Sequence, residues 1–267
     1  MKSDKSKITV RDIAAVIEAF APLPLQEDYD NAGLQVGLSG HTVNAVMLCL
    51  DVTTEVLDEA IRRKCDMIVS HHPLIFRGLK SITGADDTQR IVMRALEAGV
   101  AVYSAHTNLD STWNGVSHEM AHMLGVENLR VLECHPGSER EGLGVVGDIK
   151  PTPKLEFLRR VKDKFHVKAL RYSSQSPAIV IKRVALCGGS GASLIRNAIA
   201  AGADLYVTGD VKYHDFTSYG HDLVIADIGH YESELCSMRI FSRIIRQRFP
   251  DLVIYFSDDQ KNPIEVM

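Results

Sequence analysis

Short apolar runs alternate with helical segments along most of this chain, and this alternation restricts the possible fold more than any other feature. The runs at 46–50, 67–70 and 100–104 each have the length of a buried strand. Between them, residues 54–63 and 88–98 repeat their apolar positions with the period of an amphipathic helix. Strands that alternate with helices in this way are typical of a parallel sheet covered by helices. The sequence therefore predicts an α/β fold.

The strand, helix, strand unit occurs a second time. Val46 lies 138 positions before Val184, and the same shift aligns further residues without a gap. The aligned pairs are Leu48 with Leu186, Cys49 with Cys187, Ala60 with Ala198, Ile61 with Ile199, Asp66 with Asp204, and Val69 with Val207. A chance match between short units rich in Ala, Val and Ile is the alternative.

We therefore predict two similar α/β lobes with mostly parallel sheets that face a shared metal-binding cleft. Ligands of open α/β sheets bind outside the carboxyl ends of the strands. The first lobe is expected over 1–130 and is completed by 230–267, and the second lobe over 131–229. The stretch 133–144, rich in Pro, Gly, Ser and charge, is interpreted as a linker, and 231–248 as one long helix.

Two adjacent histidines stand where the strand at 67–70 must end. His71 and His72 come directly before Pro73, so the strand turns into a loop at this point. At such a turn both imidazoles can point into one cavity, which suits metal binding. The competing interpretation is a pair of exposed loop histidines. Other ligands elsewhere in the chain decide between these two.

Further polar side chains follow the ends of predicted strands. They are His106, Asp110, Asp210, His214, Asp227, His230 and Glu234. His230 and Glu234 are four residues apart at the start of a predicted helix, which places both on one face. Three histidines and two carboxylates are enough for two divalent ions about 3.5 to 4 Å apart. Zinc, manganese, iron and nickel all accept such donors.

A different metal motif competes with this site. Residues His118-Glu119-Met120-Ala121-His122 match HExxH, in which two histidines bind zinc and the glutamate acts as base. A metalloprotease would also need a third ligand from a following segment, and the residues after Gly125 offer no such helix. We interpret the motif as the polar side of an ordinary helix.

Other features point to substrate contacts. Lys212 and His214 follow a strand of the second lobe and are candidates for binding a substrate phosphate. The turn 188–191 has the sequence Gly-Gly-Ser-Gly, which suits a tight turn between strand and helix better than an anion-binding cradle. Trp113 and Tyr213 could stack on a base or pack in the fold.

Composition restricts partners and location. The net charge is −4, so the chain as a whole lacks the basic character of a nucleic-acid-binding protein, although a local basic surface or a ring-shaped assembly could still bind one. The five cysteines are scattered and fit reduced core thiols better than disulfides or metal ligands. No apolar run is long enough to span a membrane, and the N-terminus lacks the apolar core of a signal peptide. We expect no membrane association and a cytoplasmic location.

Five sequence blocks resemble the Nif3-like family, whose members are often labelled GTP cyclohydrolase I type 2 homologue. The blocks are Asp30-Asn31-Ala32-Gly33-Leu34-Gln35-Val36-Gly37, Ser70-His71-His72-Pro73-Leu74-Ile75-Phe76, Ala105-His106-Thr107-Asn108-Leu109-Asp110, Thr208-Gly209-Asp210, and Asp227-Ile228-Gly229-His230-Tyr231-Glu232-Ser233-Glu234. The resemblance implies two α/β lobes, a dinuclear metal centre and a toroidal homohexamer. Carried over by motif, the implied metal ligands are His71, His72, Asp110, His230 and Glu234. His106 matches a family histidine that is either a ligand or a proton carrier beside the metals.

These observations together predict a dinuclear metal-dependent hydrolase-like protein. The expected substrate is a small molecule, with GTP or another nucleotide as the candidate that the family label suggests. A phosphoesterase acting on a small phosphorylated molecule is one alternative. A non-catalytic metal-binding scaffold or regulator is the other.

Overall fold

The computed structural model describes residues 7–267, and their contacts divide the chain into two compact units. The first unit consists of the described residues up to Leu109 together with Ser237–Lys261. The second unit consists of Asp110–Cys236 and Asn262–Met267. Residues 110–130 and 230–236, which the sequence analysis assigned to the first lobe, thus belong to the second unit.

The first unit contains a five-stranded sheet in the order β1-β4-β3-β2-β11. Its strands are β1 (Gly33–Val36), β2 (Ala45–Cys49), β3 (Met67–Ser70), β4 (Ala101–Ser104) and β11 (Val253–Phe256). Its helices are α1 (Val10–Phe20), η1 (Leu23–Leu25), α2 (Thr54–Arg62), α3 (Asp87–Ala98) and α10 (Ser237–Arg248), and α4 (Thr107–Ser111) crosses from this unit into the second. Strands β4, β3, β2 and β11 run parallel, and only β1 is antiparallel to its neighbour.

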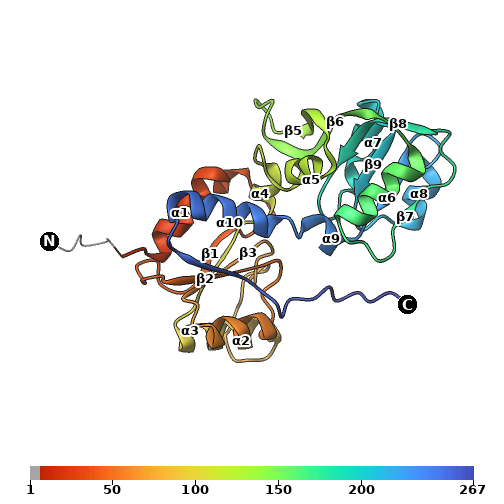
Figure 1. Ribbon diagram of the computed structural model, residues 1–267. Coiled ribbons are helices and arrows are strands. Elements are labelled where there is room, and N and C mark those ends of the chain that lie inside the picture. Colours follow the sequence, from red (N-terminus) through yellow and green to blue (C-terminus); the bar gives the residue numbers. More distant parts are fainter. Residues whose placement is uncertain (1–6) are drawn as a thin grey trace. The chain divides into compact units, whose positions relative to one another are not determined.

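The sheet of the first unit is buried on both faces. Helices α1 and α10 cover one face, and α2 and α3 cover the other (Figure 1). Because side chains alternate along a strand, Met47 and Ile68 pack beneath α2 and α3, while their neighbours Val46 and Val69 point to the opposite face and are equally buried. Thr9 begins α1 as the sequence predicts, since its side chain and that of Asp12 form a capping box.

The second unit contains a six-stranded sheet in the order β5-β6-β8-β9-β10-β7. Its strands are β5 (Glu127–Cys134), β6 (Gly142–Pro153), β7 (Arg171–Tyr172), β8 (Val180–Leu186), β9 (Leu205–Thr208) and β10 (Val224–Asp227). Its helices are α5 (Val116–Leu124), α6 (Lys154–Lys164), η2 (Ala192–Leu194), α7 (Ile195–Ala200), α8 (Tyr213–Tyr219) and α9 (His230–Glu234). The central strands β8, β9 and β10 are parallel, and antiparallel strands flank them on both sides. Helix α5 packs against β6 and β8, which explains why residues 110–130 group with this unit.

The two units repeat the same hydrogen-bonding pattern at the predicted shift of 138 residues. Strands β2 and β3 pair Val46 with Met67, and strands β8 and β9 pair the corresponding Val184 with Leu205. Both units also share one side-chain hydrogen bond beside these strands. The Asp66 carboxylate accepts the Asn44 N–H at 2.7 Å, and the Asp204 carboxylate accepts the Lys182 N–H at 2.7 Å. Such a match in side-chain bonding favours a true internal duplication over a chance alignment.

Two local predictions were wrong. The stretch 133–144 is neither a linker nor a lobe boundary: it contains the end of β5, a hairpin turn and the start of β6 within the second unit, because Cys134 of β5 pairs with Gly142 of β6. The segment 231–248 is two helices, since α9 ends at Glu234 and α10 begins at Ser237. This break coincides with the passage of the chain from the second unit to the first.

The described residues confirm the expectation about cysteine and add one observation on membranes. All five cysteines are free thiols, and four of them are buried. Burial raises the pKa of the Cys65 thiol to about 11 and that of Cys187 to about 12, which keeps both protonated at neutral pH. None of the helices in residues 7–267 has the length and apolar character that crossing a lipid bilayer requires.

Candidate metal centre

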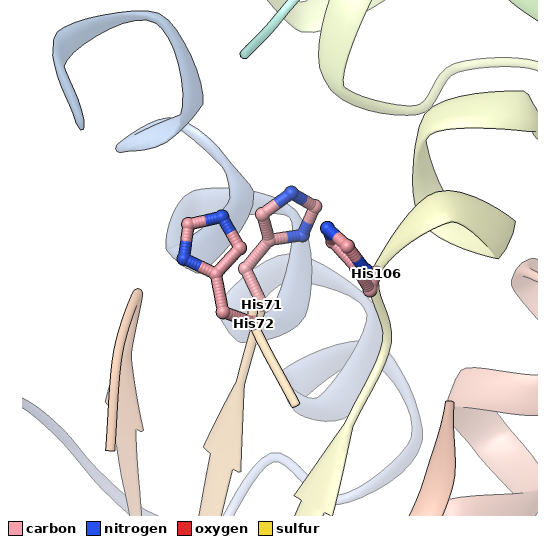
Figure 2. A group of neighbouring side chains, drawn as sticks. All are labelled: His71, His72 and His106. Atoms are coloured by element: carbon pink, nitrogen blue, oxygen red, sulfur yellow. The ribbon is translucent and has the colours of Figure 1, made fainter. Parts of the chain in front are cut away.

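Three histidines of the first unit form a compact group at the carboxyl ends of β3 and β4 (Figure 2). The ring centroids of His71 and His72 are 5.1 Å apart, and the ring of His106 is 5.3 Å from each. Each residue offers one ring nitrogen, and these three nitrogens lie within 4.8 Å of one another. That spacing allows one ion to contact all three.

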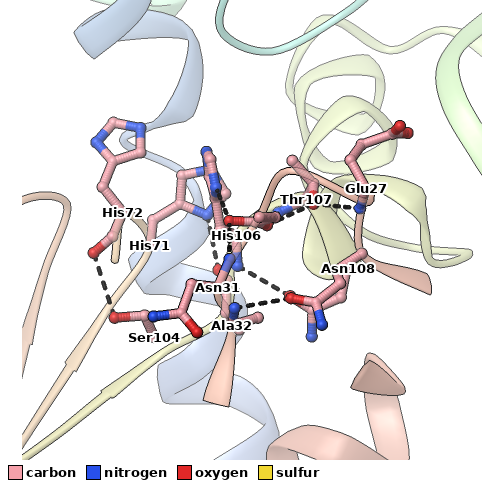
Figure 3. Close-up of polar contacts among 12 residues, drawn as sticks. Glu27, Asn31, Ala32, His71, His72, Ser104, His106, Thr107 and Asn108 are labelled. Atoms are coloured by element: carbon pink, nitrogen blue, oxygen red, sulfur yellow. Dashed lines mark hydrogen bonds and ion pairs between the residues drawn. The ribbon is translucent and has the colours of Figure 1, made fainter. Parts of the chain in front are cut away.

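Backbone hydrogen bonds fix His71 and His72 just after the end of β3, where the regular alternation of side chains stops. The N–H groups of His71 and His72 still donate to carbonyls of the β2 end, at 3.2 Å to Cys49 and 2.9 Å to Leu50. The His72 carbonyl then accepts a hydrogen bond from the Ser70 hydroxyl at 2.8 Å. Ser104 at the end of β4 adds a second, longer bond to the same carbonyl (Figure 3). The backbone is therefore fixed just where the strand becomes a loop.

Each ring of this group is held through its Nδ1 atom. His71 Nδ1 lies 2.9 Å from the Ala105 carbonyl oxygen, and His72 Nδ1 lies 2.8 Å from a carboxylate oxygen of Asp51. His106 Nδ1 lies 2.8 Å from Asp30. An acceptor at Nδ1 fixes the proton there and directs the lone pair of Nε2 outward, as in most histidines that bind metals. The acceptors are thus part of the site.

Asp30 organises one side of the group. Besides the His106 ring, its carboxylate accepts hydrogen bonds from the N–H and hydroxyl of Thr107, whose hydroxyl in turn accepts the Glu27 N–H at 2.9 Å (Figure 3). Burial alone would raise the pKa of Asp30, but the hydrogen bonds from His106 and Thr107 outweigh it and hold that pKa below its usual range. Asp30 therefore stays ionised and can stabilise a positive charge on His106.

The second unit contributes a histidine and carboxylate pair. His230 Nε2 lies 3.0 Å from Glu234 Oε2, and His230 Nδ1 lies 2.7 Å from Asp210 Oδ2. Glu234 is 3% exposed, so this carboxylate is placed by packing rather than by solvent. The hydrogen bond to Glu234 and then that to Asp210 raise the pKa of His230 to about 9. The predicted i, i+4 arrangement in a single helical turn is present in α9.

Glycine residues allow the backbone to approach this pair. A Cβ atom on Gly209, the residue that corresponds to His71 in the repeat, would lie 2.8 Å from the backbone nitrogen of His230. A Cβ atom on Gly189 would lie 2.1 Å from a carboxylate oxygen of Glu234. The second copy of the repeat therefore cannot hold a histidine where the first copy does.

The Gly-Gly-Ser-Gly turn is a tight turn, as the sequence analysis favours. Its N–H groups donate to side chains of the same unit: Gly189 to the Ser233 hydroxyl at 2.9 Å and Gly191 to the Thr208 hydroxyl at 3.0 Å. The Gly188 N–H lies 3.4 Å from the Ser117 hydroxyl. Since these donors are already used, the turn has no ring of free amides for a phosphate.

The remaining candidates differ in their surroundings. Asp110 is half-buried in α4. Lys212 and His214 are both exposed; Lys212 lines a pocket, and the centre of the His214 ring lies 5.4 Å from that of Tyr213. Asp227 is buried and accepts the N–H groups of Val211 and Gly229 and the guanidinium of Arg171, so it shapes the loop before His230.

Asp210, the partner of His230, was among the predicted candidates, but the partners of the three histidines of the first unit were not. Asp51 follows the end of β2, so the rule that found the other candidates would also have found it. Asp30 lies 76 residues from His106 in a loop before β1, and no local pattern connects the two. The Ala105 carbonyl is a backbone group, which residue types cannot reveal.

The HExxH motif lies in α5, and the expectation that it forms the polar side of this helix is wrong for His118, which is buried, while His122 is exposed. His118 is 2% exposed and stacks on Trp113 at 4.4 Å between ring centroids, with the Arg140 guanidinium on Trp113 as well, at 4.7 Å. Neither ring nitrogen of His118 has a hydrogen-bond partner among residues 7–267. His122 is exposed, and no group of three potential donors in the described chain includes either histidine. The protease interpretation is not supported.

The burial of His118 should make the stability of the folded protein sensitive to acid. Burial, and then the charge of His122, lower its pKa to about 4, against about 6.5 in an unfolded chain. Between these values the unfolded state binds the extra proton, so stability falls as the pH drops from 6.5 to 4, by about 3 kcal/mol. We expect His118→Phe to remove this loss, as measured by urea unfolding at several pH values. His221→Gln, a change at an exposed histidine that does not act on His118, is the control and should follow the parent, whereas parallel curves for His118→Phe and the parent would contradict the prediction.

A family comparison agrees with these features. The model of the Duf34/NIF3 (NGG1p interacting factor 3) family matches residues 8–263. The chain belongs to the DUF34/NIF3 family. A DUF34/NIF3 relative from Clostridium acetobutylicum, named GTP cyclohydrolase 1 type 2 homolog, is 35% identical over 239 residues, which cover 88% of this chain and 89% of the relative. The resemblance found in the sequence is thereby confirmed.

Solved structures of DUF34/NIF3 proteins confirm the α/β fold. A Bacillus cereus protein related to NIF3 superposes with a TM-score of 0.86 at 24% identity, covering 97% of this chain and 99% of that one. Reduced HcgD from Methanocaldococcus jannaschii superposes with a TM-score of 0.81 at 28% identity, covering 94% of this chain and 98% of that one. Both matches extend over the two units of the chain, so the pair of α/β sheets is the fold of these proteins as well.

Proposed function

We propose that this DUF34/NIF3 protein is a dinuclear metal-dependent hydrolase-like protein. The proposed ligands of the two divalent ions are His71, His72, Asp110, His230 and Glu234. The proposal rests on a feature that four candidate histidines share. In His71, His72, His106 and His230, the Nδ1 atom lies within hydrogen-bond distance of a carboxylate or carbonyl oxygen. Metal-binding histidines usually have this arrangement, and here four histidines that have it collect at the carboxyl ends of strands.

The donor set fits borderline divalent metals. Imidazole and carboxylate groups suit zinc, manganese, iron and nickel. The Cys187 thiol does not compete as a ligand, because burial raises its pKa to about 12 and keeps it protonated at neutral pH. Two such ions, when bound, would supply a water of lowered pKa and Lewis-acid polarisation of the bond to be cleaved. His106 would move the proton in this reaction, because ionised Asp30 at its Nδ1 stabilises the protonated ring.

The proposed substrate is a small molecule with a nucleotide character. GTP is one candidate, since the relatives carry the name GTP cyclohydrolase 1 type 2 homolog. A phosphoesterase reaction on a small phosphorylated molecule is the alternative that the exposed Lys212 favours. A toroidal homohexamer is part of the proposal and is testable by light scattering of the purified protein. A metal-binding scaffold without turnover is the outcome if no substrate is consumed.

Metal analysis tests the ligands directly. We expect His71→Ala and Glu234→Ala to lower the number of bound divalent ions per chain relative to the parent, as measured by mass spectrometry after dialysis, because each removes a donor. His122→Ala is the matched control, since this exposed histidine lies outside the proposed set. Unchanged stoichiometry in the two site variants with loss in His122→Ala would overturn the assignment in favour of the HExxH motif.

Activity is tested separately from binding. Metal-loaded parent protein should consume GTP or a phosphoester, and Asp110→Ala should abolish the turnover while its circular dichroism spectrum stays that of the parent. No turnover above chelator-treated controls across such substrates would favour the scaffold.

A further inference from the structure

A polar pocket lies on the second unit beside the His230 segment. We propose that this pocket binds the phosphate group of a small phosphomonoester, such as a phosphorylated sugar or a nucleotide. The inference deepens the proposed function and rests on it for the role of His230. The pocket has a volume of about 440 Å³. Its polar side chains are two cations, Arg196 and Lys212, two carboxylates, Asp210 and Asp215, and the hydroxyls of Ser190, Ser193 and Tyr219.

The guanidinium of Arg196 is held in place by one hydrogen bond and keeps N–H groups available for a ligand. Its Nε donates a hydrogen bond to the Tyr219 hydroxyl at 2.9 Å, and its guanidinium carbon lies 5.8 Å from the centre of the Tyr219 ring. Within residues 7–267 the two terminal nitrogens make no hydrogen bond to the protein. A guanidinium held at one edge with two free N–H arms suits the paired oxygens of a phosphate.

Lys212 supplies the second positive charge. The carboxylate of Asp215, which also lines the pocket, accepts the Lys212 backbone N–H at 3.1 Å at the start of α8. The Lys212 ammonium has no ion-pair partner in the described part of the chain. Two cations without ion-pair partners and the exposed hydroxyls of Ser190 and Ser193 therefore line one pocket.

Phosphate in this pocket would be bound by side chains rather than by backbone N–H groups. The amides of the neighbouring glycine turn donate to Ser233 and Thr208 and are not available to a ligand. The helix that follows the turn, α7, is only six residues long and so contributes little dipole. Phosphate affinity in this pocket should thus depend on Arg196 and Lys212 and respond to their replacement.

Asp210 connects the pocket to the candidate metal ligands. Its carboxylate lines the pocket and accepts from His230 Nδ1 at 2.7 Å. Its backbone has φ of 55°, a left-handed conformation that few residues other than glycine adopt, so the position is held by its surroundings. A molecule whose phosphate occupies the pocket would have its other end beside His230. This arrangement favours a substrate that is anchored by a phosphate and reacts elsewhere in the molecule.

Binding of inorganic phosphate to the chelator-treated full chain tests the pocket. We expect the double variant Arg196→Gln with Lys212→Gln to weaken phosphate binding about tenfold or more, as measured by equilibrium dialysis, because two charge-assisted contacts are lost. The matched control is Arg159→Gln with Lys164→Gln, which removes the same charge from exposed positions on α6. Ribose 5-phosphate should compete with phosphate, and ribose should not.

Two results would overturn the proposal. One is equal weakening in both double variants, which would mean a diffuse effect of surface charge. The other is parent protein that binds phosphate no better than acetate. Metal stoichiometry of the same proteins separates this inference from the proposed function. Loss of phosphate binding only in the pocket variant supports the pocket even if the parent holds no metal, and metal retention with no phosphate binding removes the pocket alone.

Discussion

Replacing Gly189 by alanine is expected to weaken divalent metal binding about 100-fold or more, the largest effect we predict for any single methyl group in this protein. The new Cβ atom would lie 2.1 Å from Glu234 Oε1 and 3.4 Å from Cε1 of His230. The carboxylate end of Glu234 can swing away, so the fold survives. The movement takes a buried carboxylate off the His230 ring, however, and so separates the pair that we propose as ligands.

Gly202→Ala is the matched control for this prediction. Gly189 and Gly202 have similar left-handed backbones, with φ of 62° and 71°, so alanine costs about 1 kcal/mol at each. At Gly202 the nearest atom to the new Cβ is an Arg183 nitrogen at 3.9 Å, which leaves room for it. Titration calorimetry with zinc should separate the two variants. Equal affinities for Gly189→Ala and Gly202→Ala would show that the His230–Glu234 pair does not bind the metal.

The repeat was predictable because its strands are buried on both faces. Strands β2, β3 and β9 are fully buried, as are the last three residues of β8, and the helices between them have a clear period, so the alignment of Val46 with Val184 holds in the hydrogen-bond register as well. Strand β5 was missed for the opposite reason. It lies at the edge of its sheet with most residues exposed, and its charged side chains hide the strand pattern.

In the candidate site, too, some residues could be predicted from the sequence and others could not. His71, His72, His106 and His230 could be found because they directly follow strands of the sheets, where ligands of α/β proteins collect. Their acceptors are less accessible to sequence reasoning. Asp30 reaches His106 only because β1 folds back antiparallel to β4, a pairing that depends on the whole first unit. The break between α9 and α10 was missed because the apolar positions continue through Leu235 and Cys236.

Glu59 is expected to control the stability of the first unit. Its side chain is fully buried in α2, and it reaches the turn after β11, where it accepts the Ser257 hydroxyl at 2.6 Å and the N–H groups of Asp258 and Asp259 at 3.0 and 3.1 Å. Arg63 Nε lies 2.8 Å from its other oxygen. Burial would raise the pKa of Glu59, but these bonds lower it on balance, so the carboxylate stays charged at neutral pH.

Glu59→Ala should therefore lower the free energy of unfolding by about 3 kcal/mol, because several buried donors lose their acceptor at once. Since the folded-state pKa is depressed, the stabilisation by Glu59 is present above the unfolded value of about 4.3 and disappears as the pH falls through the lower folded-state value. The parent and the variant should thus converge in acid. Urea unfolding followed by circular dichroism at pH 7 and pH 3 measures both effects.

The control for Glu59→Ala is Glu55→Ala, an exposed carboxylate in the first turn of the same helix, which should cost no more than about 1 kcal/mol. The turn that Glu59 holds also contains Gln260, whose side-chain oxygen accepts the Leu50 N–H at 2.8 Å, next to the Asp51 that fixes His72. Loss of Glu59 should consequently reduce metal affinity as well as stability. A variant that unfolds like the parent, or that loses stability equally at both pH values, would mean that the buried carboxylate is not what fastens β11 and its turn to α2.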